Sequence, residues 1–193
     1  MQKDLLTKIL YQESDIQKRC QELGTQITKD YANKNPILIC TLKGGFMFFA
    51  ELLKNIQCDL SIEFIKATSY IGVQSSGNVT LKNFVNFDIQ DKDILIVEDI
   101  VDTGLTAQKL VQHFQQHQAK SIEIVTLLSK PSRREVNINP KYIGFEIEDC
   151  FVIGYGLDYN EKYRNLPCVG IMNLKYLDKY CLLYTSPSPR DCS

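Results

Sequence analysis

Apolar residues gather in short runs along the chain, with polar segments between them. The clearest runs are 36–42 (PILICTL), 93–100 (DILIVEDI) and 121–130 (SIEIVTLLSK). Runs of this length, rich in β-branched residues, are typical of strands that are buried on both faces of a sheet. A further strand is predicted at 61–70 (SIEFIKATSY), and shorter strands are predicted at 142–147, 151–156 and 168–174.

Three segments have helical patterns instead. Ser14 and Gln17 are spaced as a capping box, and apolar residues follow at helical spacing as far as about Tyr31. Segment 46–56 (FMFFAELLKNI) predicts an apolar helix, and 104–116 predicts a second amphipathic one. Strands that alternate with helices predict an α/β fold, in which helices flank both faces of a mainly parallel sheet.

The end of the chain departs from this pattern. Residues 181–193 (CLLYTSPSPRDCS) are rich in Ser and Pro and show no period. We predict a single domain over residues 1–180, a size that suits one core, followed by a non-native or disordered tail over 181–193.

Charge and composition narrow the class of protein. The formal net charge of −1 argues against a broad basic surface for nucleic acid. The chain has no apolar run long enough to span a bilayer, and it begins without the pattern of a secretory signal. The seven cysteines lack metal-clip spacing, which predicts reduced thiols. We therefore expect a cytoplasmic protein with no nucleic-acid or membrane partner. His113 and His117 lie at i and i+4, where a solvated helix surface is the preferred interpretation.

The stretch VEDIVDTGLT, residues 97–106, carries the main candidate chemistry. It follows a buried strand and opens a helix, where backbone N–H groups attract a phosphate. Thr103 and Thr106 can add hydroxyl donors, and Gly104 permits close approach of the backbone. In a doubly wound sheet, ligands bind beyond the carboxyl ends of the strands, so the position fits as well.

Three carboxylates accompany this turn. Glu98 and Asp99 can accept hydrogen bonds from ribose hydroxyls or hold Mg²⁺, and Asp102 can serve as a general base. A phosphorylated ribose with a metal would use all of these groups. The alternative is that Asp102 only caps the helix, while Glu98 and Asp99 are solvated.

With its flanking segments, this stretch resembles the phosphoribosyl pyrophosphate (PRPP) signature of the purine phosphoribosyltransferases. LKGGFMFFAELL, SYIGVQSSG, KPSRRE and FVIGYGLDYNEKYRNLP resemble further motifs of the bacterial-type hypoxanthine-guanine members, in the same order. The resemblance covers roughly residues 37–174. It implies a type I phosphoribosyltransferase core with a small hood formed by terminal segments. It also implies Mg²⁺-dependent transfer of a 5-phosphoribosyl group from PRPP to hypoxanthine or guanine, which gives IMP or GMP and pyrophosphate in purine salvage.

The resemblance also assigns roles to residues. PRPP would be bound by Lys43, Gly44, Gly45, Glu98, Asp99, Asp102, Thr103, Gly104, Leu105, Thr106 and Arg164. Mg²⁺ would be held by Glu98, Asp99 and Asp158. The purine would be bound by Lys130, Phe151, Val152 and Asp158, with Asp102 as the catalytic base near the N7 proton. Ser69 and Tyr70 would begin a mobile loop that closes over the site. The Leu42–Lys43 peptide is expected to be cis.

Several alternatives stay open. By residue type alone, Lys43 and Lys130 would be solvated, Phe151 would be a core residue, and Asp158 with Arg164 would form a surface ion pair. Segment 69–78 could be an ordinary exposed loop. At the level of function, the alternatives are an enzyme that prefers xanthine or accepts 6-oxopurines broadly, and a regulator that senses PRPP. The family resemblance also implies a homodimer or homotetramer.

Overall fold

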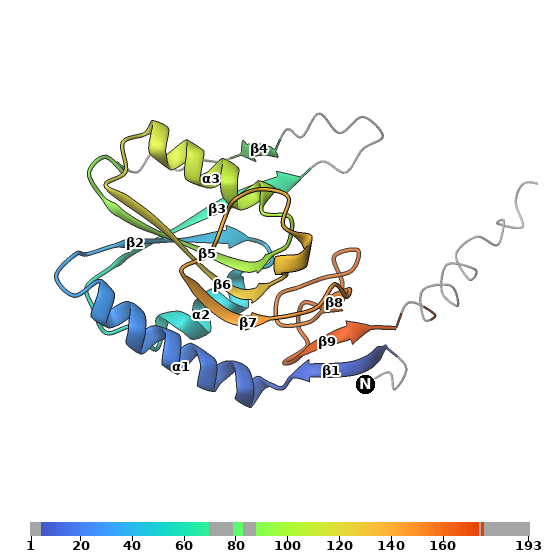
Figure 1. The fold of residues 1–193 in the computed structure, drawn as a ribbon. Helices are drawn as coiled ribbons and strands as arrows, with labels where there is room; N and C mark the ends of the chain where they lie inside the picture. Colours follow the sequence, from blue (N-terminus) through green and yellow to red (C-terminus); the bar gives the residue numbers. More distant parts are fainter. Residues whose placement is uncertain (1–4, 70–78, 83–87, 174, 176–193) are drawn as a thin grey trace, which may run out of the picture.

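The computed structural model describes residues 5–69, 79–82, 88–173 and 175. A six-stranded sheet forms the centre of the molecule (Figure 1). Its strands, in order across the sheet, are β4 (Val79–Lys82), β3 (Ser61–Ser69), β2 (Ile37–Leu42), β5 (Asp93–Val101), β6 (Ser121–Ser129) and β7 (Tyr142–Glu146). All neighbouring pairs are parallel except β3 and β4, so the predicted, mainly parallel sheet is confirmed.

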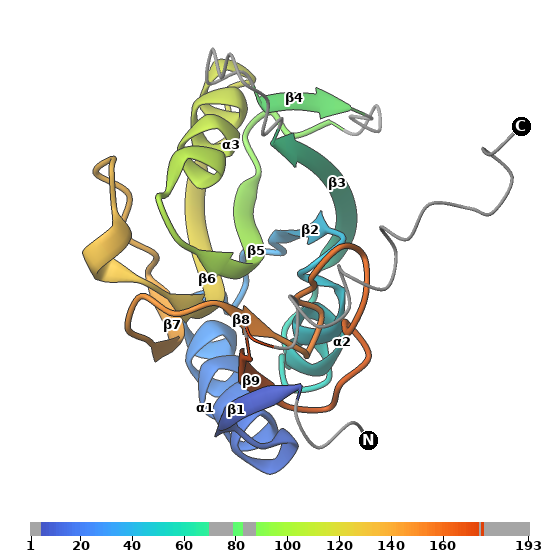
Figure 2. The same ribbon diagram turned by 90° about the vertical axis from the view of Figure 1, so that its right-hand side faces the viewer.

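Helices cover both faces of this sheet (Figure 2). Helices α1 (Glu13–Asp30) and α2 (Phe46–Leu53) lie on one face, and α3 (Leu105–Gln116) lies on the other. Successive residues of a strand point to opposite faces. Leu38 therefore packs into the core beneath α1 and α2, whereas its neighbour Ile39 packs beneath α3. Burial on both faces explains why β2 and β5 are continuous apolar runs.

A second, smaller sheet forms the hood that the family resemblance implied. Its strand order is β1 (Leu6–Tyr11), β9 (Val169–Met172) and β8 (Val152–Ile153), and both pairings are antiparallel. The pairing of β1 with β9 brings two segments that are far apart in the sequence side by side. Figure 1 shows this sheet beside the carboxyl ends of the central strands.

Several predicted boundaries were wrong. Helix α1 begins earlier than the Ser14–Gln17 capping box implied, because Asp15 instead accepts a hydrogen bond of 2.9 Å from the backbone N–H of Gln12. The strand predicted over 151–156 is only Val152–Ile153, since Gly154 and Gly156 have positive φ values of 96° and 99°. Strands β1 and β4 were not predicted, and helix α2 ends at Leu53 rather than residue 56.

Other predictions are confirmed only in part. The five described cysteines are free thiols, and Cys20, Cys40 and Cys168 are buried. His117 is exposed at the end of α3, as expected, and its ring centroid lies 4.1 Å from that of the half-buried His113. No helix within the described ranges is long and apolar enough to cross a membrane. The predicted tail at 181–193 lies outside the described residues and stays a prediction.

Candidate active site

A cavity of about 470 Å³ opens at the carboxyl ends of β2 and β5. It brings together ten of the predicted residues: Lys43, Gly44, Glu98, Asp99, Asp102, Thr103, Gly104, Thr106, Asp158 and Arg164. The cavity lining does not include Gly45, Leu105, Lys130, Phe151 or Val152. Tyr70 and the side chain of Ser69 lie outside the described part of the chain.

The turn between β5 and α3 forms one wall of this cavity. Gly104 has a φ of 86°, which a residue with a Cβ rarely adopts, and it is the N-cap of α3. The first N–H groups of a helix have no carbonyl partner within that helix. At the start of α3, these N–H groups lie close to the cavity, whose lining includes Thr103 and Thr106. The exposed Leu105 directs its N–H toward the Thr103 hydroxyl oxygen, with the nitrogen at 3.4 Å. The local geometry therefore suits a phosphate.

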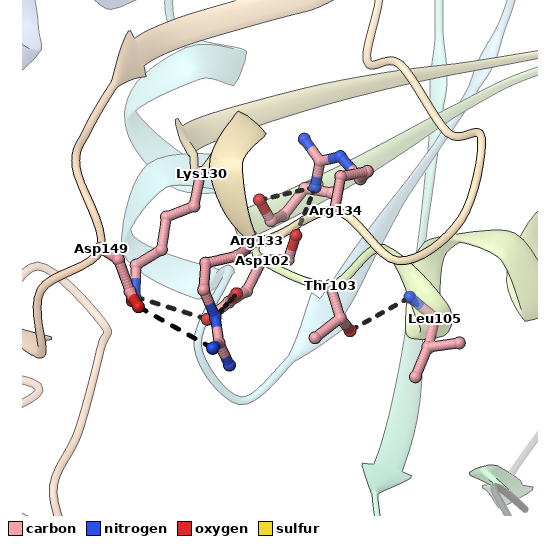
Figure 3. Close-up of polar contacts among 8 residues, drawn as sticks. Asp102, Thr103, Leu105, Lys130, Arg133, Arg134 and Asp149 are labelled. Carbon is pink, nitrogen blue, oxygen red and sulfur yellow. Dashed lines mark hydrogen bonds and ion pairs between the residues drawn. The ribbon is translucent and has the colours of Figure 1, made fainter.

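Arg134 braces this turn, and it was not identified from the sequence. Its guanidinium donates to the carbonyl oxygens of Val101 and Asp102 at 2.8 and 2.7 Å (Figure 3). It also donates to the Ser129 hydroxyl at 2.9 Å. The only signal in the sequence was the basic cluster KPSRRE, which does not show which arginine turns inward.

We expect Arg134→Met to loosen the turn. Two carbonyls would lose a charged donor, and leaving such partners unsatisfied costs about 1–3 kcal/mol of stability. If the turn binds the 5-phosphate of PRPP, as the family resemblance implies, its displacement should also raise the KM for PRPP about tenfold, the equivalent of about 1.4 kcal/mol. Steady-state kinetics and thermal unfolding test both effects. Lys92→Met is the control, because Lys92 is exposed and makes no ion pair among the described residues. Equal behaviour of the two variants would contradict a bracing role for Arg134.

Glu98 and Asp99 form the floor of the cavity. Glu98 is 4% exposed and Asp99 is half-buried, so the alternative that both are solvated is wrong. Burial, with repulsion from Asp99, raises the pKa of Glu98 to about 8. Burial likewise raises the pKa of Asp99 to about 6, although its carboxylate accepts the Ile100 N–H at 3.0 Å. A Cβ on Gly44 would overlap the Asp99 carboxylate, which explains the glycine at that position.

These carboxylates fit a divalent cation. Glu98 Oε1 is buried and has no hydrogen-bond partner among the described residues, so one oxygen is available for a ligand. Within the same residues, no three His, Cys, Asp or Glu side chains gather closely enough to hold a metal ion. Mg²⁺ commonly takes one or two carboxylates and completes its shell with water and phosphate oxygens, so the pair suffices.

The raised pKa values predict how stability depends on pH. Both acids bind protons more tightly in the folded protein than at their ordinary pKa values of 4.5 and 3.8. Their stabilising contribution is therefore complete below about pH 4 and is lost as the pH rises through about 6 and then about 8. Thermal unfolding from pH 4 to 9 should show a smaller loss of stability for Glu98→Gln than for the unchanged protein. Parallel curves would contradict the prediction.

The cavity lining also includes two cations, Lys43 and Arg164, each paired with a carboxylate. Lys43 Nζ lies 2.7 Å from the Glu161 carboxylate, and Arg164 lies 2.9 Å from Asp158. Arg164 also donates to the Gly156 carbonyl at 2.8 Å. The ion pair of Asp158 and Arg164, which was the alternative to a role in binding, is thus present, but both residues line the cavity. Glu161 was not identified from the sequence. The Leu42–Lys43 peptide is cis, as expected.

Lys130 and Phe151 lie outside the cavity lining, in segments that follow the β5–α3 turn along the chain. Lys130 follows β6 and is 6% exposed, so the alternative that it is solvated is wrong. Its ammonium lies 3.4 Å from Asp102 and 3.5 Å from Asp149 (Figure 3). Phe151 is 44% exposed rather than a core residue, and it meets the ring of Tyr159 edge-on at 5.9 Å. Val152 is buried and pairs with Ile171.

Comparison with known proteins identifies the class of protein to which this fold and this cavity belong. The family model described as "Phosphoribosyl transferase domain" matches residues 7–160. The chain therefore belongs to the phosphoribosyltransferase family, and its similar relatives are hypoxanthine-guanine phosphoribosyltransferases. The Staphylococcus aureus (strain Mu50) relative is 46% identical over 168 residues, which are 86% of this chain and 94% of the relative. The Bacillus subtilis (strain 168) relative is 45% identical over 173 residues, which are 89% and 96% of the two chains.

Solved structures agree with this assignment. The crystal structure of a hypoxanthine phosphoribosyltransferase from Staphylococcus aureus matches with a TM-score of 0.85 at 45% identity, over 89% of this chain and 94% of that one. A Trypanosoma cruzi hypoxanthine phosphoribosyl transferase matches with a TM-score of 0.87 at 34% identity, over 94% and 99% of the two chains. Both the sequence and the architecture of this chain are thus similar to those of purine phosphoribosyltransferases.

Proposed function

We propose that this protein transfers the 5-phosphoribosyl group of PRPP to hypoxanthine or guanine, with Mg²⁺, in purine salvage. The products are IMP or GMP and pyrophosphate. One observation carries the proposal: a single cavity combines a helix N-terminus, a buried and a half-buried carboxylate, and the ion-paired cations Lys43 and Arg164. These parts correspond to the phosphate, the ribose with its metal, and the pyrophosphate of one substrate.

PRPP carries the three groups that match these three parts of the cavity. The turn from Asp102 to Thr106 binds the 5-phosphate through backbone N–H groups and hydroxyls, including the N–H of Leu105. Glu98 and Asp99 accept hydrogen bonds from the ribose hydroxyls. Lys43, Arg164 and the backbone at Gly44 and Gly45 meet the pyrophosphate, since cations and amides suit an oxyanion.

Glu98 and Asp99 would hold Mg²⁺ directly or through water, and Asp158 would assist. The bound ion would supply positive charge that compensates the charge of the pyrophosphate leaving group. One carboxylate oxygen of Asp158 lies 2.9 Å from the Arg164 guanidinium, and the other accepts the Glu161 N–H at 2.8 Å. Both oxygens of Asp158 therefore already face donors. Its contribution to metal binding is therefore expected to be indirect, through water.

The purine binds on the side of Lys130. Lys130 donates to the 6-oxo group, Phe151 stacks on the ring, and Val152 offers its backbone. The bond from the ribose C1′ to the pyrophosphate oxygen breaks, and a bond from C1′ to a purine nitrogen forms. Asp102 accepts the proton that the purine loses at N7, which balances the transfer.

Closure of the site is expected from the segment that begins at Ser69 and Tyr70. The family resemblance supports this proposal, and most of the segment lies outside the described residues. A closed loop would exclude water from an oxocarbenium-like ribose and prevent hydrolysis of PRPP.

We also propose a cytoplasmic homodimer or homotetramer. In the Trypanosoma cruzi hypoxanthine phosphoribosyl transferase, the C-terminal region has a role in the oligomeric state and the enzymatic activity. That relative has an oligomeric state of its own to which a chain segment contributes, and this supports an assembly for the present protein. Light scattering of the purified protein measures its assembly directly, and a monomer at micromolar concentration would contradict this part of the proposal.

A panel of bases tests the proposed function. Pyrophosphate release from PRPP and Mg²⁺ is measured with hypoxanthine, guanine, xanthine and adenine. We expect turnover with hypoxanthine and guanine, and little with adenine, whose amino group cannot accept a bond from Lys130. Turnover with xanthine alone would show that the enzyme prefers xanthine, another 6-oxopurine, to hypoxanthine and guanine. Binding of PRPP without turnover of any base would indicate a regulator instead.

A further inference from the structure

The Lys130 ammonium lies between two carboxylates that come from different segments. It is 3.4 Å from Asp102, on the turn after β5, and 3.5 Å from Asp149, between β7 and β8. Arg133 bridges the same two carboxylates, at 3.3 Å from Asp102 and 3.8 Å from Asp149. Figure 3 shows these four side chains, which we call the four-charge ring.

The two carboxylates of the ring differ in position. Asp102 lines the cavity, whereas Asp149 does not. The Asp149 side chain is 56% exposed, while that of Lys130 is only 8% exposed. Asp149 therefore approaches the buried ammonium from the solvent side, while Asp102 lies on the side toward the cavity.

We propose that Asp149 is a positioning residue that keeps Lys130 directed at the 6-oxo group of the purine while Asp102 acts as the base. The inference rests on the proposed function, and it adds a residue that neither the sequence motifs nor the cavity lining had indicated.

Charge balance within the ring supports this role. With both acids ionised, two cations face two anions. When Asp102 accepts the purine proton it becomes neutral, and Lys130 then faces one anion and the like charge of Arg133. A largely buried ammonium requires a compensating charge, because desolvation otherwise disfavours it. Within the ring, Asp149 is the carboxylate that keeps its charge through this step.

The position of Asp149 in the chain supports the same role. It lies shortly before Phe151, so one short loop carries both the anion that holds Lys130 and the ring expected to stack on the base. The contacts of 3.3–3.8 Å are longer than those of tight ion pairs. The ammonium can therefore exchange Asp102 for a purine oxygen without leaving Asp149.

Asp149→Asn tests this inference. We expect the KM for hypoxanthine to rise about three- to tenfold, in the range of a partly exposed ion pair or somewhat above, with the KM for PRPP unchanged. The inhibition constant of unsubstituted purine, which lacks the 6-oxo group, should stay as in the unchanged protein. Asp149→Glu should recover most of the affinity for hypoxanthine. Glu148→Gln is the matched control, since it removes an adjacent exposed charge that makes no ion pair among the described residues.

Two results would overturn the inference alone. One is a hypoxanthine KM in Asp149→Asn equal to that of the unchanged protein. The other is an equal loss of affinity for hypoxanthine and for unsubstituted purine, which would indicate general damage to the loop. If the unchanged protein forms no nucleotide from any base, the proposed function fails, and the inference fails with it.

Discussion

Asp102→Asn is expected to lower kcat with hypoxanthine by about 10²–10⁴-fold, the usual contribution of a positioned general base. Asparagine keeps the size of the side chain but cannot accept the purine proton. The phosphate turn depends on the backbone around Gly104 and on Arg134, which donates to the main-chain carbonyl of residue 102 rather than to its side chain. The KM for PRPP should therefore change little.

The matched measurement is PRPP binding by calorimetry in the presence of Mg²⁺, for Asp102→Asn and for the unchanged protein. Equal affinities with a large loss of kcat would separate proton transfer from binding. A variant that keeps kcat within about threefold would contradict the assignment of Asp102 as the base. Loss of PRPP binding would instead show that the carboxylate acts in the phosphate site.

Lys130→Met is expected to reduce kcat/KM for hypoxanthine and guanine by about 10- to 150-fold. A hydrogen bond from a charged donor contributes about 1.5–3 kcal/mol, and each 1.4 kcal/mol is about a factor of ten. Methionine fills similar space but donates nothing to the 6-oxo group. The preference over adenine should narrow by the same factor, because adenine never used this donor.

The control for this variant is Lys92→Met, which removes an exposed lysine just before β5. The Lys92 variant should keep the kinetics of the unchanged protein for every base. An unchanged ratio of hypoxanthine to adenine in Lys130→Met would contradict the role of Lys130 in recognising the 6-oxo group. A uniform loss for all bases would point to a general defect in the purine site.

The side of the cavity proposed to bind phosphate could be located from the sequence because its groups are contiguous. Glu98, Asp99, Asp102 and Gly104 lie at the end of one buried strand and the start of one helix, so local rules place them together. Arg134, Asp149 and Glu161 reach the site from segments that only the folded sheet brings close. Their contacts depend on strand order and side-chain direction, which a single sequence does not define.

The missed elements have similar causes. Strand β1 lies at the edge of the hood, pairs with β9, and has only exposed and half-buried residues, so its sequence lacks the buried apolar run that predicts the central strands. The Tyr11 ring at its end stacks on Phe145, with ring centroids 3.8 Å apart. The reciprocal capping of Gln12 and Asp15 makes Gln12 the N-cap of α1 in place of Ser14, although serine is the better N-cap by residue type.

Phosphorus-31 NMR of the purified protein with PRPP, Mg²⁺ and hypoxanthine tests the central claim most directly. We expect the PRPP signals to disappear while pyrophosphate and a nucleoside monophosphate appear in equal amounts, with no reaction when hypoxanthine is omitted. Unchanged PRPP, or ribose 5-phosphate and pyrophosphate without nucleotide, would contradict the proposed transfer.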